Sequence, residues 1–176
     1  MHTTRIVRLL APAALLMFAS AAFARGAYQE PEEFVRAAFG GSAPPAQLLW
    51  LTTPVAAETE RILGHPPAQR RIRYWQQGAR SAWVLEEIGK EELITTGIVV
   101  DRGRIAQVAV LAYRESRGGE VRYPRFTGQF HGAALTAGHE LDRPIDGISG
   151  ATLSVWALTK MARLALYFDG LARAQS

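Results

Sequence analysis

Residues 93–113 read LITTGIVVDRGRIAQVAVLAY, and this stretch decides the fold class. Residues 93–100 and 105–113 are two runs rich in β-branched residues, which favour strands. Asp101-Arg102-Gly103 between them is typical of a tight turn, in which glycine supplies a positive φ. Two strands joined by so short a turn pair antiparallel. The stretch therefore predicts a β-hairpin within an antiparallel sheet.

The segment before this hairpin predicts a second one. Residues 71–75 and 82–85 are β-type runs separated by Gly78. The sheet is therefore expected to have at least four strands. Residues 42–45 contain two prolines and are expected to form a loop ahead of it.

Other segments repeat apolar residues at the three- and four-residue steps of a helix. They predict a short helix over 32–39 ended by Gly40-Gly41, a helix from Thr53-Pro54 to Gly64, a helical turn over 126–130, and an amphipathic helix over 153–168 closed by Gly170. Helices beside an antiparallel sheet define an α+β fold with helices packed on the sheet.

The composition limits the possible functions. The 176 residues suit a single compact domain after a targeting segment, with residues 25–92 forming the N-terminal helices and first strands and residues 93–176 carrying the principal motif. With no cysteine, the chain has no disulfide, no thiolate metal site and no thiol nucleophile. Its net charge is +4, of which Arg5 and Arg8 supply two, and this is too mild to indicate a nucleic-acid partner.

Residues 1–24 have the composition of a secretory signal peptide. Two arginines precede an apolar run, and Ala22-Phe23-Ala24 supplies the small residues that a signal peptidase reads. Cleavage after Ala24 would leave a mature chain that begins at Arg25, and export without disulfides suits a bacterial periplasm. The alternative is an uncleaved membrane anchor, although Pro12 interrupts a run that is short for a bilayer.

The stretch DGISGATLS, residues 146–154, precedes the last helix and carries hydroxyl residues flanked by glycine and alanine. It is not a hydrolase nucleophile elbow, because the pattern G-x-S-x-G is incomplete and no histidine follows Ser149. It also lacks the glycine patterns of Walker and dinucleotide-binding loops. A glycine-rich turn that enters a helix still favours an anion. The alternative is that Ser149 or Thr152 only caps the helix.

Five residues of this stretch, Asp146, Ser149, Gly150, Ala151 and Thr152, resemble the D-x-x-S/T-G-A-T flavinylation motif of the FMN-binding domain family. That family is known from the Rnf electron-transport complex and from the sodium-translocating NADH:quinone oxidoreductase. There a flavin transferase cleaves FAD with a magnesium ion and joins the FMN phosphate to the last threonine. The resemblance implies covalent FMN at Thr152, room for the transferase at Gly150 and Ala151, and an orienting or assisting role for Asp146, whose alternative role is to cap the turn.

Residues 113–119, YRESRGG, are similar to the family's E-T-x-G-x-G loop, with Ser116 in place of threonine and looser glycine spacing. The resemblance implies that Glu115 and Ser116 lie beside the flavin. The alternative is that Glu115 pairs with a neighbouring arginine on a solvated surface. Trp156 lies one helical turn after Thr152, which places it near the flavin unless it belongs to the core.

Together these features predict an exported electron-transfer flavoprotein with FMN linked by a phosphoester to Thr152. The expected partners are the magnesium-dependent flavin transferase and a redox partner protein, free or in a membrane. No substrate pocket is evident from the sequence, which favours an electron carrier over a stand-alone enzyme. The three histidines beyond the leader have no paired spacing and are not expected to bind a metal. The alternative function is a periplasmic sensory or ligand-binding α+β domain without a covalent cofactor.

Overall fold

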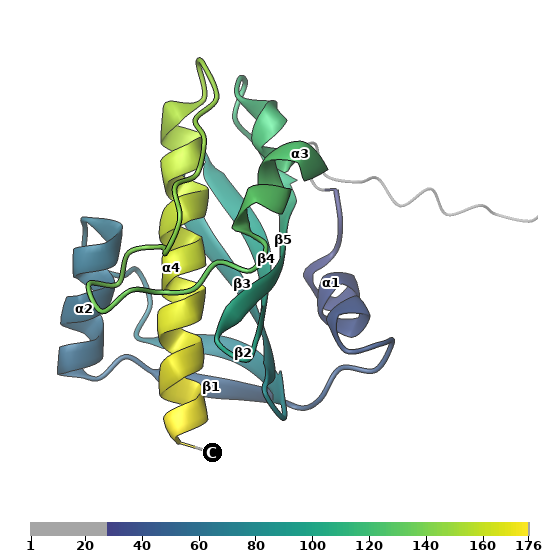
Figure 1. The fold of residues 1–176 in the computed structure, drawn as a ribbon, viewed down its shortest axis with the longest axis vertical. Helices are drawn as coiled ribbons and strands as arrows, with labels where there is room; N and C mark the ends of the chain where they lie inside the picture. The colour runs from purple at the N-terminus through teal and green to yellow at the C-terminus, as the bar shows by residue number, and fades with distance from the viewer. Residues whose placement is uncertain (1–27, 176) are drawn as a thin grey trace, which may run out of the picture.

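The computed structural model describes residues 28–175, which form an antiparallel sheet of five strands with flanking helices (Figure 1). The strands are β1 (Ala46–Trp50), β2 (Arg71–Gln77), β3 (Arg80–Ile88), β4 (Leu93–Asp101) and β5 (Arg104–Tyr113). Each strand pairs with the next one along the chain, so the predicted α+β class is confirmed. The predicted signal peptide and its cleavage after Ala24 lie outside the described residues. Within residues 28–175, none of the helices has the length and apolar character needed to cross a membrane.

Both predicted hairpins are confirmed, and their turns explain the residues found there. Arg102 and Gly103 have φ values of 50° and 73° between β4 and β5, the combination that a two-residue turn needs to match the twist of its strands. Gly78, with a φ of 58°, occupies the first position of the turn between β2 and β3.

Strand β1 is the part of the sheet that the sequence does not predict. It follows the predicted loop at 42–45 and pairs antiparallel with β2 at the edge of the sheet. Only Leu49 of its five residues is buried, while Leu48 and Trp50 are exposed. A short edge strand with one buried residue has no alternating pattern that could identify it.

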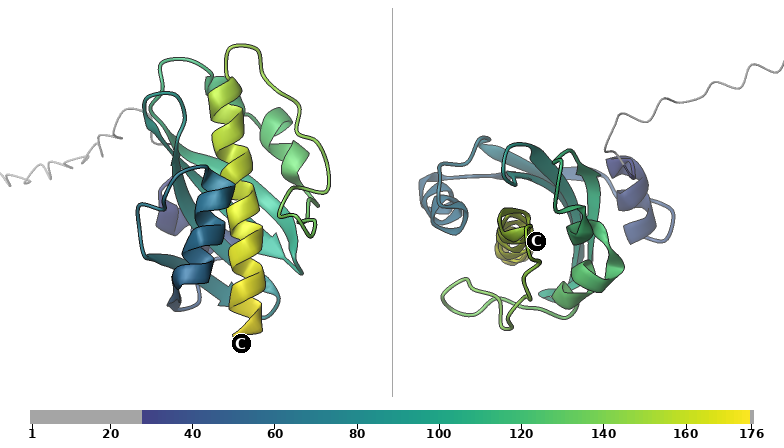
Figure 2. Two further views of the ribbon diagram at one scale, coloured as in Figure 1. Left: turned by 90° about the vertical axis from the view of Figure 1, so that its left-hand side faces the viewer. Right: turned by 90° about the horizontal axis from the view of Figure 1, so that it is seen from above.

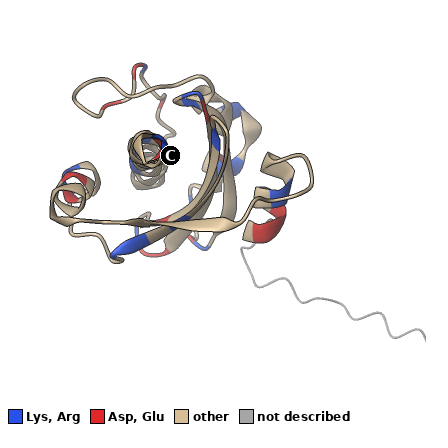
Figure 3. Cartoon of the chain, turned by 90° about the horizontal axis from the view of Figure 1, so that it is seen from below, with Lys and Arg blue, Asp and Glu red and all other residues tan. Residues whose placement is uncertain are grey.

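The sheet curls around helix α4 (Thr152–Ala174), which forms the centre of the core (Figure 2). Helix α2 (Thr53–Leu63) lies beside α4, and residues 131–151, here called the strap, pass over its remaining side. Trp83 of β3, which is fully buried, stacks on Tyr74 with ring centroids 4.8 Å apart and contacts Phe168 of α4 at 5.7 Å. The charged residues are spread over the helices, the strands and the loops (Figure 3).

The prediction that Gly170 ends the last helix is wrong. Helix α4 continues through Gly170 to Ala174, and Gly170 itself is exposed. The additional turn is held because Ala172 is fully buried and the Arg173 Nε donates to the buried Asp169 carboxylate at 2.8 Å. These contacts outweigh the helix penalty of one glycine, which is about 1 kcal/mol.

Helix α1 (Pro31–Ala38) covers the opposite, convex face of the sheet and is confirmed with its predicted glycine end. Gly97 of β4 makes this docking possible, because a Cβ there would lie 2.6 Å from the ring of Phe34. After β5 the chain forms η1 (Gly119–Arg122), α3 (Pro124–Thr127) and η2 (Gly128–Phe130). The last two correspond to the predicted helical turn. Val121 is fully buried, so the chain after β5 is anchored to the core.

Candidate functional site

The DGISGAT stretch forms a tight turn that leads directly into α4. The Ala151 amide donates to the Ile148 carbonyl at 3.0 Å, and Gly150 between them has a φ of 81°. Nothing lies within 4 Å of a Cβ built on Gly150, so glycine is favoured there by the backbone conformation and not by crowding. Thr152 is consequently the first residue of the helix.

The alternative that Ser149 or Thr152 serves only as a helix cap is wrong. The N-cap position is occupied by Ala151, which has no side-chain cap. Ser149 and Thr152 are both exposed, and within residues 28–175 neither hydroxyl has a hydrogen-bond partner. The amides of the first turn of a helix lack intrahelical acceptors and carry the positive end of its dipole. An exposed hydroxyl therefore stands where an attached phosphate is electrostatically favoured.

The structure brings the 113–119 loop against this turn. Gly118 has a φ of 79°, and a Cβ on it would lie 2.8 Å from the Cβ of Ala151. The Tyr113 hydroxyl donates to the Arg117 carbonyl and lies 3.0 Å from the hydroxyl oxygen of the buried Ser154. Burial raises the pKa of Tyr113 above its ordinary value. The loop and the start of α4 therefore form one packed unit.

This packing corrects the reason given for Ala151. Its side chain is buried against Gly118 and does not leave room for an approaching enzyme. Alanine is needed because the two backbones come so close that a larger side chain would not fit. Gly150, by contrast, is exposed and open.

Glu115 is held by backbone amides and not by arginine, so the predicted alternative of a surface ion pair is wrong. Its Oε1 accepts hydrogen bonds from the amides of Lys90, Glu91 at 2.8 Å and Glu92 at 3.0 Å, in the turn between β3 and β4. Burial acts to raise the pKa of the Glu115 carboxyl, but these bonds outweigh it and hold the pKa below its ordinary value. Ser116, next to it, is exposed.

Asp146 begins the turn and is exposed. Its amide donates to the Gln129 Oε1 at 2.8 Å, which fixes the turn to η2. The Asp146 carboxylate has no hydrogen-bond or ion-pair partner within the described residues, so it does not cap the turn. It remains available to a molecule that approaches Thr152.

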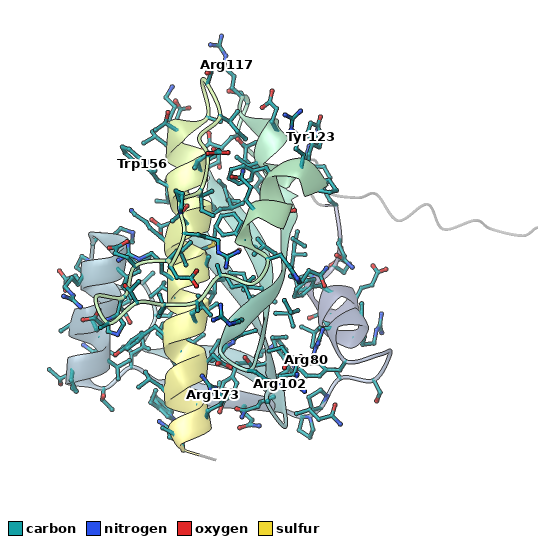
Figure 4. The ribbon with its side chains drawn as sticks, viewed as in Figure 1. Arg80, Arg102, Arg117, Tyr123, Trp156 and Arg173 are labelled. Carbon is teal, nitrogen blue, oxygen red and sulfur yellow. The ribbon has the colours of Figure 1, made fainter. Side chains whose placement is uncertain are left out.

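A cleft of about 410 Å³ opens beside Thr152, between the strap and the first half of α4. The strap contributes Arg143, Pro144 and Ile145, and the helix contributes Thr152 and Trp156. Trp156 is 58% exposed and projects from the upper half of α4, so the alternative that it is a core residue is wrong (Figure 4). The strap wall could not be predicted from the sequence, since residues 131–145 have neither a helical nor a strand period that could place them.

The three histidines beyond the leader each have a partner in the protein. His65 Nε2 lies 3.0 Å from Glu87, His131 Nδ1 lies 3.0 Å from the Ala106 carbonyl, and His139 contacts Glu58. The bond to Glu87 raises the pKa of His65. Among the described residues, no group of three or more histidine and acidic side chains is placed to hold a metal ion.

The fold and the site together define an α+β domain in which the exposed Thr152 hydroxyl stands at a helix N-terminus beside a cleft. The model of the FMN-binding domain family matches residues 89–167, from the turn between β3 and β4 into α4. This part of the chain therefore belongs to the FMN-binding domain family, which supports an FMN-binding flavoprotein. The match includes the 113–119 loop, the strap and Thr152. A search of curated proteins found no matching relative.

Proposed function

We propose that this flavoprotein carries its FMN covalently, as a phosphoester on the Thr152 hydroxyl, and serves as an electron carrier between redox partners. The observation that carries the proposal is the exposed Thr152 hydroxyl, which has no hydrogen-bond partner among the described residues and begins α4. The residues fit the group: a hydroxyl for the ester, first-turn amides for the phosphate and an adjoining cleft. The family membership supports FMN as the ligand.

Attachment requires a flavin transferase with FAD and a magnesium ion. The Thr152 oxygen bonds to the phosphorus on the FMN side of FAD as the bond from that phosphorus to the AMP oxygen breaks. The hydroxyl proton passes to a base of the transferase, and AMP leaves. We assign Asp146 the role of orienting Thr152 in that complex, and its exposed carboxylate without an ion partner in the described chain supports this role. The amides at the start of α4 then stabilise the negative charge of the product.

When bound, FMN supplies the transfer of one or two electrons. The protein contributes the position of the cofactor and its electrostatic surroundings. The proposed electron donor is a reduced redox protein and the proposed acceptor is an oxidised one. Each is either free or in a membrane. We also propose export to the periplasm, supported by the signal-peptide composition of residues 1–24.

The test is co-expression with a flavin transferase, followed by intact-mass analysis and flavin absorbance after denaturation. We expect the wild type to gain one FMN and Thr152→Ala to gain none while remaining folded, because alanine is well tolerated in a helix. Thr159→Ala is the matched control, since Thr159 lies on the same helix and lines the same cleft.

Two results would contradict the proposal in different ways. If Thr152→Ala kept the FMN mass, the attachment site would be elsewhere. If the wild type lost its flavin on denaturation, the ligand-binding alternative without a covalent cofactor would be favoured.

A further inference from the structure

We infer that the isoalloxazine ring of the FMN lies in the cleft between the strap and α4, against the indole of Trp156, and not over the 113–119 loop. This inference rests on the proposed attachment at Thr152. It assigns Trp156 as a positioning residue for the flavin ring, a role that follows from its place in the cleft.

The cleft has the size and walls of a site for a flat aromatic ligand. Its volume of about 410 Å³ falls within the roughly 300–1,000 Å³ that small-molecule sites occupy. Pro144 and Ile145 of the strap form one apolar wall, and Val155 and Trp156 of α4 form the other. Thr152 stands at the same cleft, so a ligand joined to its hydroxyl enters between these walls.

The spacing on α4 brings Trp156 within reach of a ring attached through Thr152. The two residues lie one turn apart on the same face, with a rise along the helix of about 6 Å. Side chains on a helix lean toward its N-terminus, so the Trp156 indole covers the surface between its own turn and Thr152. The flexible five-carbon chain of FMN can bridge this separation between phosphate and ring.

Trp156 is an aromatic side chain without a partner. It is 58% exposed, and within residues 28–175 it makes no ring contact and no hydrogen bond. Stacking of a second aromatic ring would remove its apolar surface from water and add a favourable ring contact. The indole is therefore an uncovered aromatic surface in the cleft beside Thr152.

The 113–119 loop is less suited to receive the ring, because it is already packed. Gly118 abuts Ala151 so closely that even a Cβ would clash. The Glu115 carboxylate is engaged by three backbone amides, and the Tyr113 hydroxyl by Arg117 and Ser154. Arg117 extends away from the upper end of the molecule (Figure 4).

The test uses flavin fluorescence of protein whose single covalent FMN at Thr152 has been established by intact mass. An indole in contact with a flavin donates an electron to its excited state and quenches the emission. We expect Trp156→Leu to raise the emission per FMN several-fold and to reduce the short-lived fraction in lifetime measurements. Trp50→Leu is the matched control, because Trp50 is 60% exposed and lies on β1, far down α4 from Thr152 (Figure 1).

A second variant tests the other position for the ring. Ser116→Trp places an indole on the exposed part of the 113–119 loop, and we expect it to leave the emission unchanged. Unchanged emission in Trp156→Leu, or added quenching in Ser116→Trp, would overturn the inference while leaving the attachment at Thr152 intact. Absence of covalent FMN from the wild-type protein would instead overturn the proposed function.

Discussion

At the scale of single residues, Gly118 and Ala151 determine how closely the 113–119 loop approaches the turn before Thr152. Gly118 combines a φ of 79° with a neighbour 2.8 Å from where its Cβ would be. Both conditions disfavour every other residue type, one through backbone strain and the other through overlap. The loop and the start of α4 therefore depend on each other for their positions.

Gly118→Ala is expected to reduce the free energy of unfolding by about 1–3 kcal/mol. Chemical denaturation of the protein without flavin measures this directly. Gly147→Ala is the matched control, because Gly147 has no atom within 4 Å of its would-be Cβ and no positive φ. Equal stability of the two variants would show that the contact between Gly118 and Ala151 does not constrain the loop.

At the scale of elements, the turn between β3 and β4 is held by the side chain of Glu115, which follows β5 in the sequence. The amides of Lys90, Glu91 and Glu92 point to one carboxylate oxygen. The pKa of Glu115 is below its ordinary value, so the carboxylate form stabilises the folded state. That contribution is present above the pKa of the unfolded chain, about 4.3, and is lost as pH falls through the lower folded pKa.

Glu115→Gln is therefore expected to lower the free energy of unfolding at pH 7. The difference from the wild type should shrink progressively below about pH 4. Denaturation curves of wild type and variant at several pH values provide the measurement. Glu91→Gln is the control, because the Glu91 side chain is exposed and pairs with Lys90 on the surface. A wild-type–variant difference that did not change with pH would indicate that the charge of Glu115 has no part in holding the turn.

Some of the strands and helix ends could be predicted from the sequence, and others could not. The hairpin at 93–113 was predictable because strand and turn preferences agree there, with Gly103 at the position that needs a positive φ. Strand β1 was not, since only Leu49 is buried. The end of α4 was misplaced at Gly170 because the tertiary contacts of Asp169 and Ala172 outweigh a local preference.

The candidate site also has one part that could be predicted from the sequence and one that could not. The glycine-containing turn that leads into α4 was predictable because its motif is local in sequence. The strap wall of the cleft was not, since only the path of a long irregular segment brings Pro144 and Ile145 to the same cleft as Trp156. His139, at the strap, contacts Glu58 of α2 and lies 4.9 Å from the Tyr167 ring of α4, contacts between residues far apart in the chain.

At the scale of the whole molecule, the region matched by the FMN-binding family is completed by the residues before it. Strand β3 pairs with β4 from Arg80↔Asp101 to Ile88↔Leu93, and α1 covers the convex face. Trp83 and Tyr74 contribute large side chains to the core around α4. Residues 28–88 thus supply one side of the fold that presents Thr152.

The location of the protein is also a property of the whole chain. We expect the mature protein to begin at Arg25 and to accumulate outside the cytoplasm, because Ala22 and Ala24 match the requirements of signal peptidase. N-terminal sequencing of the exported form, after cell fractionation, tests this. Full-length protein recovered from the membrane fraction would favour an uncleaved anchor.

The central position of α4 has a consequence for biogenesis. The ribosome makes all five strands before it makes Thr152–Ala174, and the sheet has nothing to close around until that helix appears. A chain interrupted before Phe168 retains the attachment motif but lacks part of the core that holds it in place. If the proposed transferase requires the threonine at the start of an intact helix, the proposed attachment of FMN also acts as quality control, and incomplete chains are left without a flavin.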